Sequence, residues 1–149
     1  FLGVALAVAP VGAWLAVTGS FAEFPLLVAL GVTLWVAGFD TIYGCQDADF
    51  DRGVGLHSLA VRHGPAGALA IARVLHVLAV IALAAAFRSG PSLGVVSLLG
   101  VAVMAGLLVW EHRIVRGGDL SRIDMAFFTV NSWIGMVLFG FVVLDLYLF

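Results

Sequence analysis

The chain has 149 residues, of which 63% are hydrophobic and 11% are charged, with 18 glycines and 4 prolines. Soluble domains have about 45–50% apolar and about 25% charged residues, so this composition excludes a soluble enzyme and a nucleic-acid-binding protein, and it is too apolar for a disordered chain. The formal net charge is −2, and the single cysteine, Cys45, excludes an internal disulfide scaffold.

Five apolar runs predict an all-α, polytopic membrane helix bundle. The runs cover residues 1–17, 25–44, 65–87, 92–110 and 124–148, and the segments between them carry turn-forming and charged residues. Each run is long enough to cross the roughly 30 Å hydrocarbon core of a bilayer. Because a backbone in lipid must satisfy its own hydrogen bonds, all five runs are expected to be helices.

The charges of the loops predict the orientation. Five crossings place loops 46–64 and 111–122 on one side, where Glu111 and its neighbours are expected to be solvated loop charges. The other side holds only Arg88, whereas the first side holds five arginines: Arg52, Arg62, Arg113, Arg116 and Arg122. Arg73 lies nearer the first side. Since short cytoplasmic loops collect basic residues, both long loops are predicted to be cytoplasmic.

The first run has neither a starting Met nor a basic start, and it lacks a small-residue cleavage site. A signal peptide is therefore not expected. The chain reads as the C-terminal part of a longer protein.

Carboxylates concentrate after the second apolar run. If that helix continues to residue 51, then Asp40, Tyr43, Asp47 and Asp51 share one face and Asp49 points away. Carboxylates one turn apart repel, and near hydrocarbon they need a cation or a proton. Oxygen ligands suit Mg²⁺, which usually keeps several waters and also binds substrate phosphates.

Other interpretations of this segment differ in what they require. A solvated acidic loop needs no helical register, and a calcium loop fails because Arg52 replaces the required Gly and Ser58 replaces the bidentate Glu. An ion-coupled transporter, with Asp40 binding the ion, predicts polar groups deep in several spans. Few such groups are visible in the sequence: Ser97, Asn131, Ser132 and, near an end, Asp145.

Glycines and basic residues follow the carboxylates. Gly53 and Gly55 are expected to end the acidic helix, and Ser58 is expected to cap the next one. Arg62 and His57 are candidates for binding phosphate oxygens. Positive-inside anchoring is the alternative role for Arg62, and simple surface exposure is the alternative for His57.

The segment also resembles a known motif. The run Gly38-Phe-Asp-Thr-Ile-Tyr-Gly-Cys-Gln-Asp-Ala-Asp-Phe-Asp51, followed by Gly-Leu-His-Ser and Arg-His-Gly, resembles the second aspartate-rich motif of the UbiA-type intramembrane prenyltransferases. The stretch from Phe127 to Asp145 is similar to the last helix of that family. The sequence around Cys45 most resembles the 4-hydroxybenzoate polyprenyltransferase-like branch.

This resemblance implies a fold and a site. The family fold has nine transmembrane helices around a central cavity, of which this chain would form the second half. Asp47 and Asp51 would be the Mg²⁺ ligands, with Tyr43 and Asp40 lining the site deeper in the helix. Asp47, Asp51 and Tyr43 are the expected catalytic residues, and Asp40, Arg62 and His57 are the expected cofactor-binding residues. The chain departs from the family in lacking the first aspartate-rich motif and in having His57 where a Lys is common.

The implied reaction is the transfer of a polyprenyl group from polyprenyl diphosphate to a hydroxylated aromatic acid. The bacterial 4-hydroxybenzoate branch implies a role in the biosynthesis of a respiratory quinone, ubiquinone, at a bacterial inner membrane. The alternative acceptor is 1,4-dihydroxy-6-naphthoate, for menaquinone. The lipid bilayer is the expected surrounding, and no nucleic acid is involved. With half of the diphosphate site missing, this chain alone is expected to be inactive.

Overall fold

A computed structural model describes residues 2–148, and every regular element in that range is helical. The elements are α1 (Leu2–Thr18), α2 (Glu23–Tyr43), α3 (Ala48–Gly53), α4 (Leu59–Ser89), α5 (Val95–Ile114), the 3₁₀ turn η1 (Arg116–Gly118), the π-helix η2 (Met125–Val130) and α6 (Asn131–Leu148). The prediction of an all-α bundle is confirmed.

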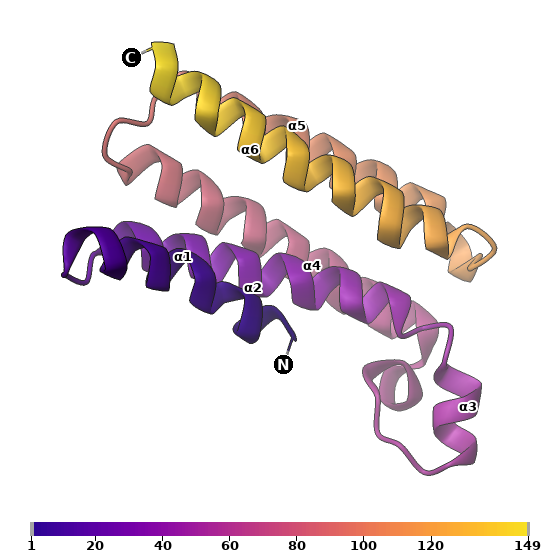
Figure 1. Cartoon of the computed structure of the whole chain (residues 1–149). Helices are drawn as coiled ribbons and strands as arrows, with labels where there is room; N and C mark the ends of the chain where they lie inside the picture. The colour runs from indigo at the N-terminus through magenta and orange to yellow at the C-terminus, as the bar shows by residue number, and fades with distance from the viewer. Residues whose placement is uncertain (1, 149) are drawn as a thin grey trace.

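Four of these helical segments are long and apolar enough to cross a membrane: Glu23–Tyr43, Leu59–Ser89, Val95–Ile114 and Met125–Leu148. The fifth predicted span, α1, is apolar but has 17 described residues, at the lower limit of about 17–25 for a span. The α2–α4 and α5–α6 connections lie at one end of the bundle, and the α1–α2 and α4–α5 connections lie at the other (Figure 1).

The helices form two pairs that lie along one another. Helix α2 packs closely against α4 and carries α1 on its other side, whereas α6 packs against α5 (Figure 1). Glycines permit the close contact between α2 and α4. A Cβ atom on Gly31 would lie 2.6 Å from the Leu83 Cγ atom, and one on Gly38 would overlap the His76 ring. Larger residues at either position would push the two helices apart.

The start of the third predicted helix differs from the structure. The run that was expected from residue 65 begins at Leu59, and Ser58 caps it as predicted, because the Ser58 hydroxyl accepts a hydrogen bond from the Val61 N–H at 3.3 Å. A bend at Gly64, with φ of 69°, separates this first turn from the rest of α4. Glycine is required there because other residues rarely adopt positive φ.

The prediction that Glu111 is a solvated loop charge is wrong. Helix α5 continues to Ile114, and the Glu111 side chain is completely buried. Inside the bundle the Glu111 carboxyl accepts a hydrogen bond from Asn131 Nδ2 at 3.1 Å, which offsets part of its loss of water.

A buried carboxylate joins the C-terminal end of α6 to the N-terminal end of α5. Asp145, near the end of α6, is fully buried and accepts hydrogen bonds from the Gly94 N–H at 2.6 Å and the Ser97 N–H at 2.9 Å, as well as from the Ser97 hydroxyl. These N–H groups belong to the first turn of α5, which has no side-chain cap of its own. Asp145 therefore caps α5 from a different helix.

This contact predicts that Asp145→Ala destabilises the protein. The change leaves the first turn of α5 without an acceptor, and loss of a helix cap costs about 0.5–2 kcal/mol. The midpoint of thermal unfolding of the full-length protein in detergent should fall. Glu23→Ala, which removes an exposed carboxylate at the same end of the bundle, is the control and should shift the midpoint less. Equal shifts would show that charge, not capping, is responsible.

Candidate active site

The acidic segment is bent and is not one continuous helix. Helix α2 ends at Tyr43, and the chain makes a tight turn in which the Cys45 N–H donates to the Ile42 carbonyl and the Gln46 N–H donates to the Tyr43 carbonyl, each at 3.1 Å. The single-face register expected across residues 40–51 is therefore wrong. The turn has a physical cause, since these i to i+3 hydrogen bonds replace the i to i+4 pattern of α2.

The two predicted metal ligands remain on one short helix. The Asp51 N–H donates to the Asp47 carbonyl at 2.8 Å, so Asp47, the residue that precedes α3, lies one helical turn from Asp51 within it. Asp47 is exposed and Asp51 is half-buried. Asp49 instead pairs with Arg52 at 2.8 Å on the exposed surface.

A small apolar cluster fixes α3 against the membrane helices. Cys45 and Ala48 are buried together with Ala60 of α4 and with Val115 and Ile123 from the loop between α5 and α6. Burial raises the pKa of the Cys45 thiol, which favours the neutral form and a packing role. The acidic cap, residues 44–58, therefore projects beyond the bundle but is attached at its base (Figure 1).

Tyr43 belongs to an aromatic wall between α2 and η2. Its ring centroid lies 4.2 Å from that of Phe127, and Phe127 also makes an edge contact with Phe39 at 5.3 Å. Phe39 in turn contacts Trp35 at 5.9 Å. Three of the four rings belong to the last three turns of α2, and Phe127 belongs to η2. Asp40 is half-buried on the same stretch of α2.

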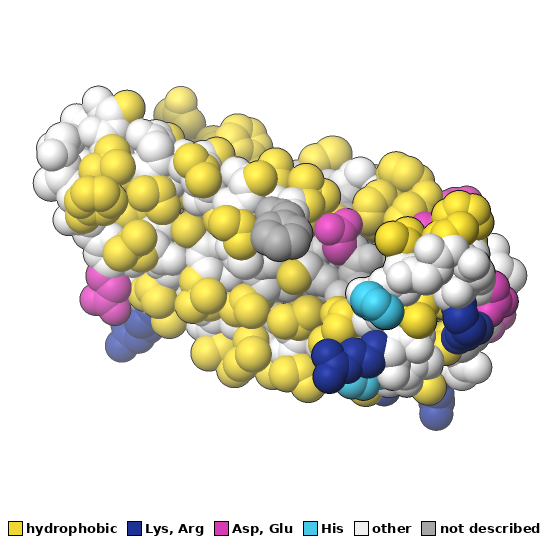
Figure 2. Space-filling model, turned by 90° about the horizontal axis from the view of Figure 1, so that it is seen from below, with side chains coloured by type: hydrophobic (Ala, Val, Ile, Leu, Met, Phe, Trp, Pro, Cys, Tyr) yellow, Lys and Arg dark blue, Asp and Glu magenta, His cyan; other side chains and the backbone are white. Residues whose placement is uncertain are grey.

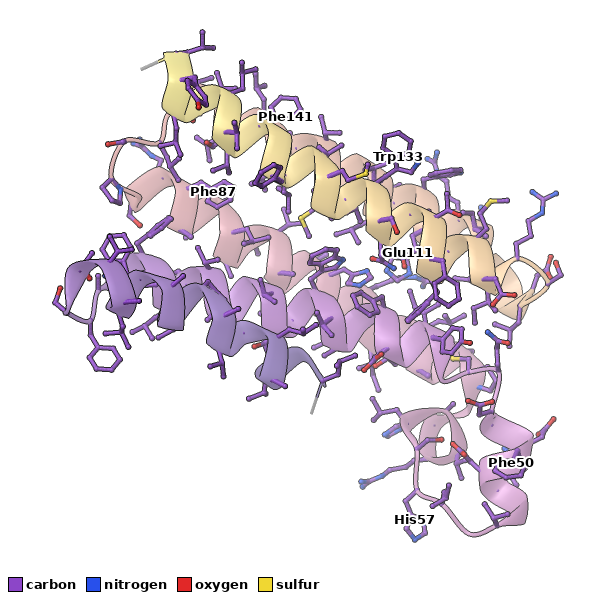
Figure 3. The ribbon with its side chains drawn as sticks, in the orientation of Figure 1. Phe50, His57, Phe87, Glu111, Trp133 and Phe141 are labelled. Carbon is purple, nitrogen blue, oxygen red and sulfur yellow. The ribbon has the colours of Figure 1, made fainter. Side chains whose placement is uncertain are left out.

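The two predicted phosphate-binding residues lie at the α3 end of the bundle, and within residues 2–148 no ion pair joins them to Asp47 or Asp51. Arg62 is exposed in the first turn of α4, and its N–H donates to the Ser58 carbonyl at 3.0 Å. His57 is exposed in the connection after α3, at the far edge of the projecting cap (Figure 3). Their assignment remains a prediction.

The donor set fits one side of a magnesium site. Within residues 2–148 no group of three or more His, Cys, Asp or Glu side chains converges as a metal cage. Asp47 and Asp51 offer two carboxylates one turn apart, and neither forms an ion pair with a described cation. Mg²⁺ is usually bound by one or two carboxylates plus waters and substrate phosphates, so this pair suits it.

A buried polar network that the sequence did not predict lies deeper in the bundle. The Trp35 indole N–H donates to Asn131 Oδ1 at 2.9 Å, and Asn131 Nδ2 donates to Glu111 Oε1 at 3.1 Å. Beyond Glu111, His76 Nδ1 lies 3.5 Å from Glu111 Oε2 and 3.1 Å from His112 Nε2. Four helices are thus joined through one network, with Glu111 between the two helix pairs (Figure 3).

The sequence analysis noted Asn131 as one of the few polar groups inside the spans, but it missed the participation of Glu111 and His76. Nothing in the apolar run around His76 marks its partner, which lies 36 positions away at His112. These buried groups also weaken the sequence argument against a transporter, which relied on the scarcity of polar groups inside the spans. The family match given below distinguishes a prenyltransferase from a transporter.

An apolar cavity of about 700 Å³ adjoins the network. It lies between α1, α2, α4 and α6, and Trp35, Val28, Val32, Leu138 and Val142 are among its lining residues. Trp35 therefore connects the polar network to the cavity wall. Such a cavity accepts apolar groups and excludes water.

Apolar helices long enough to cross a membrane, with a carboxylate-bearing cap at one end, define an integral membrane protein. The model of the UbiA prenyltransferase family matches residues 1–144. The chain therefore belongs to the UbiA prenyltransferase family.

Similar proteins agree with this membership. The chain is 31% identical over 146 residues to a 4-hydroxybenzoate octaprenyltransferase of Nitrosospira multiformis, covering 97% of this chain and 49% of the relative. It is 36% identical over 123 residues to the protein of that name in Chromohalobacter salexigens, covering 82% of this chain and 40% of the relative. The structure of a UbiA homolog from Aeropyrum pernix in its apo form matches with a TM-score of 0.81 and 31% identity, over 97% of this chain and 54% of that one. The chain thus spans about half the length of these relatives.

The network predicts that Asn131→Ala destabilises the protein. The change leaves the Trp35 N–H and Glu111 Oε1 without partners, and each orphaned buried group costs about 1–3 kcal/mol. Thermal unfolding in detergent should show a clear loss. Ser132→Ala is the matched control, because the exposed Ser132 hydroxyl bonds only to the Phe128 carbonyl of its own helix at 2.6 Å. A control that is as unstable as Asn131→Ala would contradict the role of the network.

Proposed function

We propose that the protein transfers a polyprenyl group from polyprenyl diphosphate to a hydroxylated aromatic acid, with Mg²⁺ as cofactor. The observation that carries this proposal is the juxtaposition of Asp47 and Asp51 on α3 with the aromatic wall that begins at Tyr43. Membership of the UbiA family and similarity to 4-hydroxybenzoate octaprenyltransferases support it.

The proposed role of each residue, in binding the metal, binding the phosphates or lining the site, follows from its surroundings. Asp47 and Asp51 would hold Mg²⁺ on the cap, which when bound neutralises the diphosphate and stabilises departing pyrophosphate. Arg62 and His57 supply donors for phosphate oxygens from the same end. Asp40, which is half-buried about one helical turn before Tyr43, would line the part of the site below Asp47 and Asp51.

The aromatic wall suits the carbon centre of the reaction. The faces of aromatic rings attract cations, and Tyr43 packs against Phe127 where α2 meets η2. Apolar surroundings exclude the water that would otherwise capture an allylic cation. The cavity lined by Trp35 and its apolar neighbours accommodates part of the isoprenoid chain.

The proposed setting is a bacterial inner membrane, with the cap and the α5–α6 loop facing the cytoplasm. Arginines favour this orientation, because those two connections share one end of the bundle and carry most of the basic residues outside the spans. The chain then forms the C-terminal part of a nine-helix domain. Its first aspartate-rich motif would lie in the other half.

The metal assignment predicts that Asp47→Asn and Asp51→Asn each lower prenyl transfer by the full-length enzyme by at least about 100-fold, since each removes a charged ligand of the diphosphate-bound ion. Initial rates over a Mg²⁺ titration measure the loss. Asp49→Asn is the matched control, because Asp49 lies on the same helix but pairs with Arg52 at the surface. Rates within about threefold of wild type for Asp47→Asn would refute the assignment.

The acceptor is proposed to be 4-hydroxybenzoate, in ubiquinone biosynthesis, with 1,4-dihydroxy-6-naphthoate for menaquinone as the rival. Incubating the full-length enzyme with both acids at equal concentration and one prenyl diphosphate separates them when the products are identified by mass. We expect the prenylated benzoate to dominate, in agreement with the names of the relatives. Dominant naphthoate product would replace the acceptor and keep the mechanism, whereas product from neither acid would remove the quinone-precursor assignment.

A further inference from the structure

A second cavity, of about 570 Å³, lies between α4 and α5 and shares no lining residue with the cavity beside the aromatic wall. The Glu111 network separates the two. Trp35, at one end of the network, lines the first cavity, whereas His76 and His112, at the other end, line the second. The second cavity therefore opens on a different face from the proposed reaction.

This second cavity has one basic end and one apolar end. Its walls include Val80 and Ile81 of α4 and Ala105 of α5, which are apolar, and three arginines: Arg73, Arg113 and Arg116. Arg73 precedes Ile81 by eight residues, which corresponds to about 12 Å along a helix. Because α5 runs antiparallel to α4, its basic residues follow Ala105 toward the same end, as the contact between His76 and His112 fixes.

The arginines at this end are not neutralised by the protein. The lining contains no carboxylate, and the ion pairs found among residues 2–148 are Arg52 with Asp49 and His76 with Glu111. Hydrophobic side chains also cover most of the face seen in Figure 2, where most of the Arg side chains in view lie toward one end. The guanidinium groups of Arg73, Arg113 and Arg116 are therefore available to bind an anion.

The occupant must match both ends of the cavity. Guanidinium groups bind phosphate oxygens through their planar fork, and the apolar walls continue from them along the direction in which the helices cross the bilayer. A phospholipid at a membrane surface has this arrangement, with its phosphate at the interface and its acyl chains directed inward. Basic pockets between transmembrane helices on the cytoplasmic side are a recurrent form of anionic-lipid site.

We propose that the groove between α4 and α5 binds an anionic phospholipid of the surrounding membrane, with the phosphate on Arg73, Arg113 and Arg116 and an acyl chain along Val80, Ile81 and Ala105. The proposal does not rest on the transferase activity. It concerns a face that the Glu111 network separates from the aspartates and the aromatic wall.

Lipid binding to the full-length protein tests this site. Native mass spectrometry of the detergent-solubilised protein, titrated with phosphatidylglycerol or phosphatidylcholine, gives the two affinities. We expect phosphatidylglycerol to bind at least about tenfold more tightly, and the double variant Arg73→Gln/Arg116→Gln to lose most of that preference. The control Arg88→Gln/Arg122→Gln removes the same charge from exposed arginines outside the groove and should keep the preference.

A second measurement starts from labelling of the wild-type protein. Phosphatidylglycerol with a photoreactive group in its acyl chain should label wild-type peptides from residues 77–81 and 105–109, and Ala105→Phe, which fills the groove, should reduce that labelling. Equal affinity for the two lipids, labelling elsewhere, or equal losses in the two double variants would overturn the proposal. Displacement of bound phosphatidylglycerol by polyprenyl diphosphate at micromolar concentration would also overturn it, because the groove would then be a substrate site.

Discussion

The hydrogen-bonded contact between Asn131 and Glu111 is the interaction on which the arrangement of the two helix pairs depends. Apolar helices in lipid gain little by exchanging lipid contacts for one another, so packing and polar contacts select their partners. Asn131 joins α6 to Glu111 of α5 and to Trp35 of α2, and Glu111 lies beside His76 of α4. Each polar group reaches its partner only when the four helices adopt one register.

The same asparagine stabilises the backbone next to the aromatic wall. Asn131 Nδ2 also donates to the carbonyls of Ala126 and Phe127, at 3.2 Å and 2.9 Å, within the π-helix η2. A π-helical turn leaves carbonyls without their usual partners, and a side-chain donor can supply them. Phe127 packs on Tyr43, so the position of the wall depends on the network four residues away.

The sequence predicted the elements better than their ends. Hydropathy and turn residues located the apolar helices, the stop at Gly53 and the cap at Ser58, because these depend on local chemistry. It missed the burial of Glu111, because the carboxyl is compensated by Asn131, which is 20 positions away and belongs to a different helix. Contacts of this kind depend on which helices meet, and a hydropathy pattern holds no such information.

The candidate site shows the same division. The placement of Asp47 and Asp51 one turn apart followed from their spacing and is preserved in α3. The bend after Tyr43 did not follow, since no proline occurs there and Gly44 has an ordinary helical conformation, with φ of −62° and ψ of −9°. The bend is held instead by burial of Cys45 and Ala48 against Ala60, a tertiary contact.

The bend resolves a conflict that a continuous helix would leave. Two carboxylates one turn apart repel each other, and ionised side chains near hydrocarbon are strongly disfavoured. On the projecting cap, Asp47 is exposed to water, whereas Tyr43 stays at the end of α2 against Phe127. The polar and apolar parts of the proposed site therefore lie on separately supported elements, α3 on its small apolar cluster and the aromatic wall on the Asn131 network. An amphiphilic substrate, with a diphosphate at one end and an isoprenoid chain at the other, requires this separation of a hydrated end from a dry one.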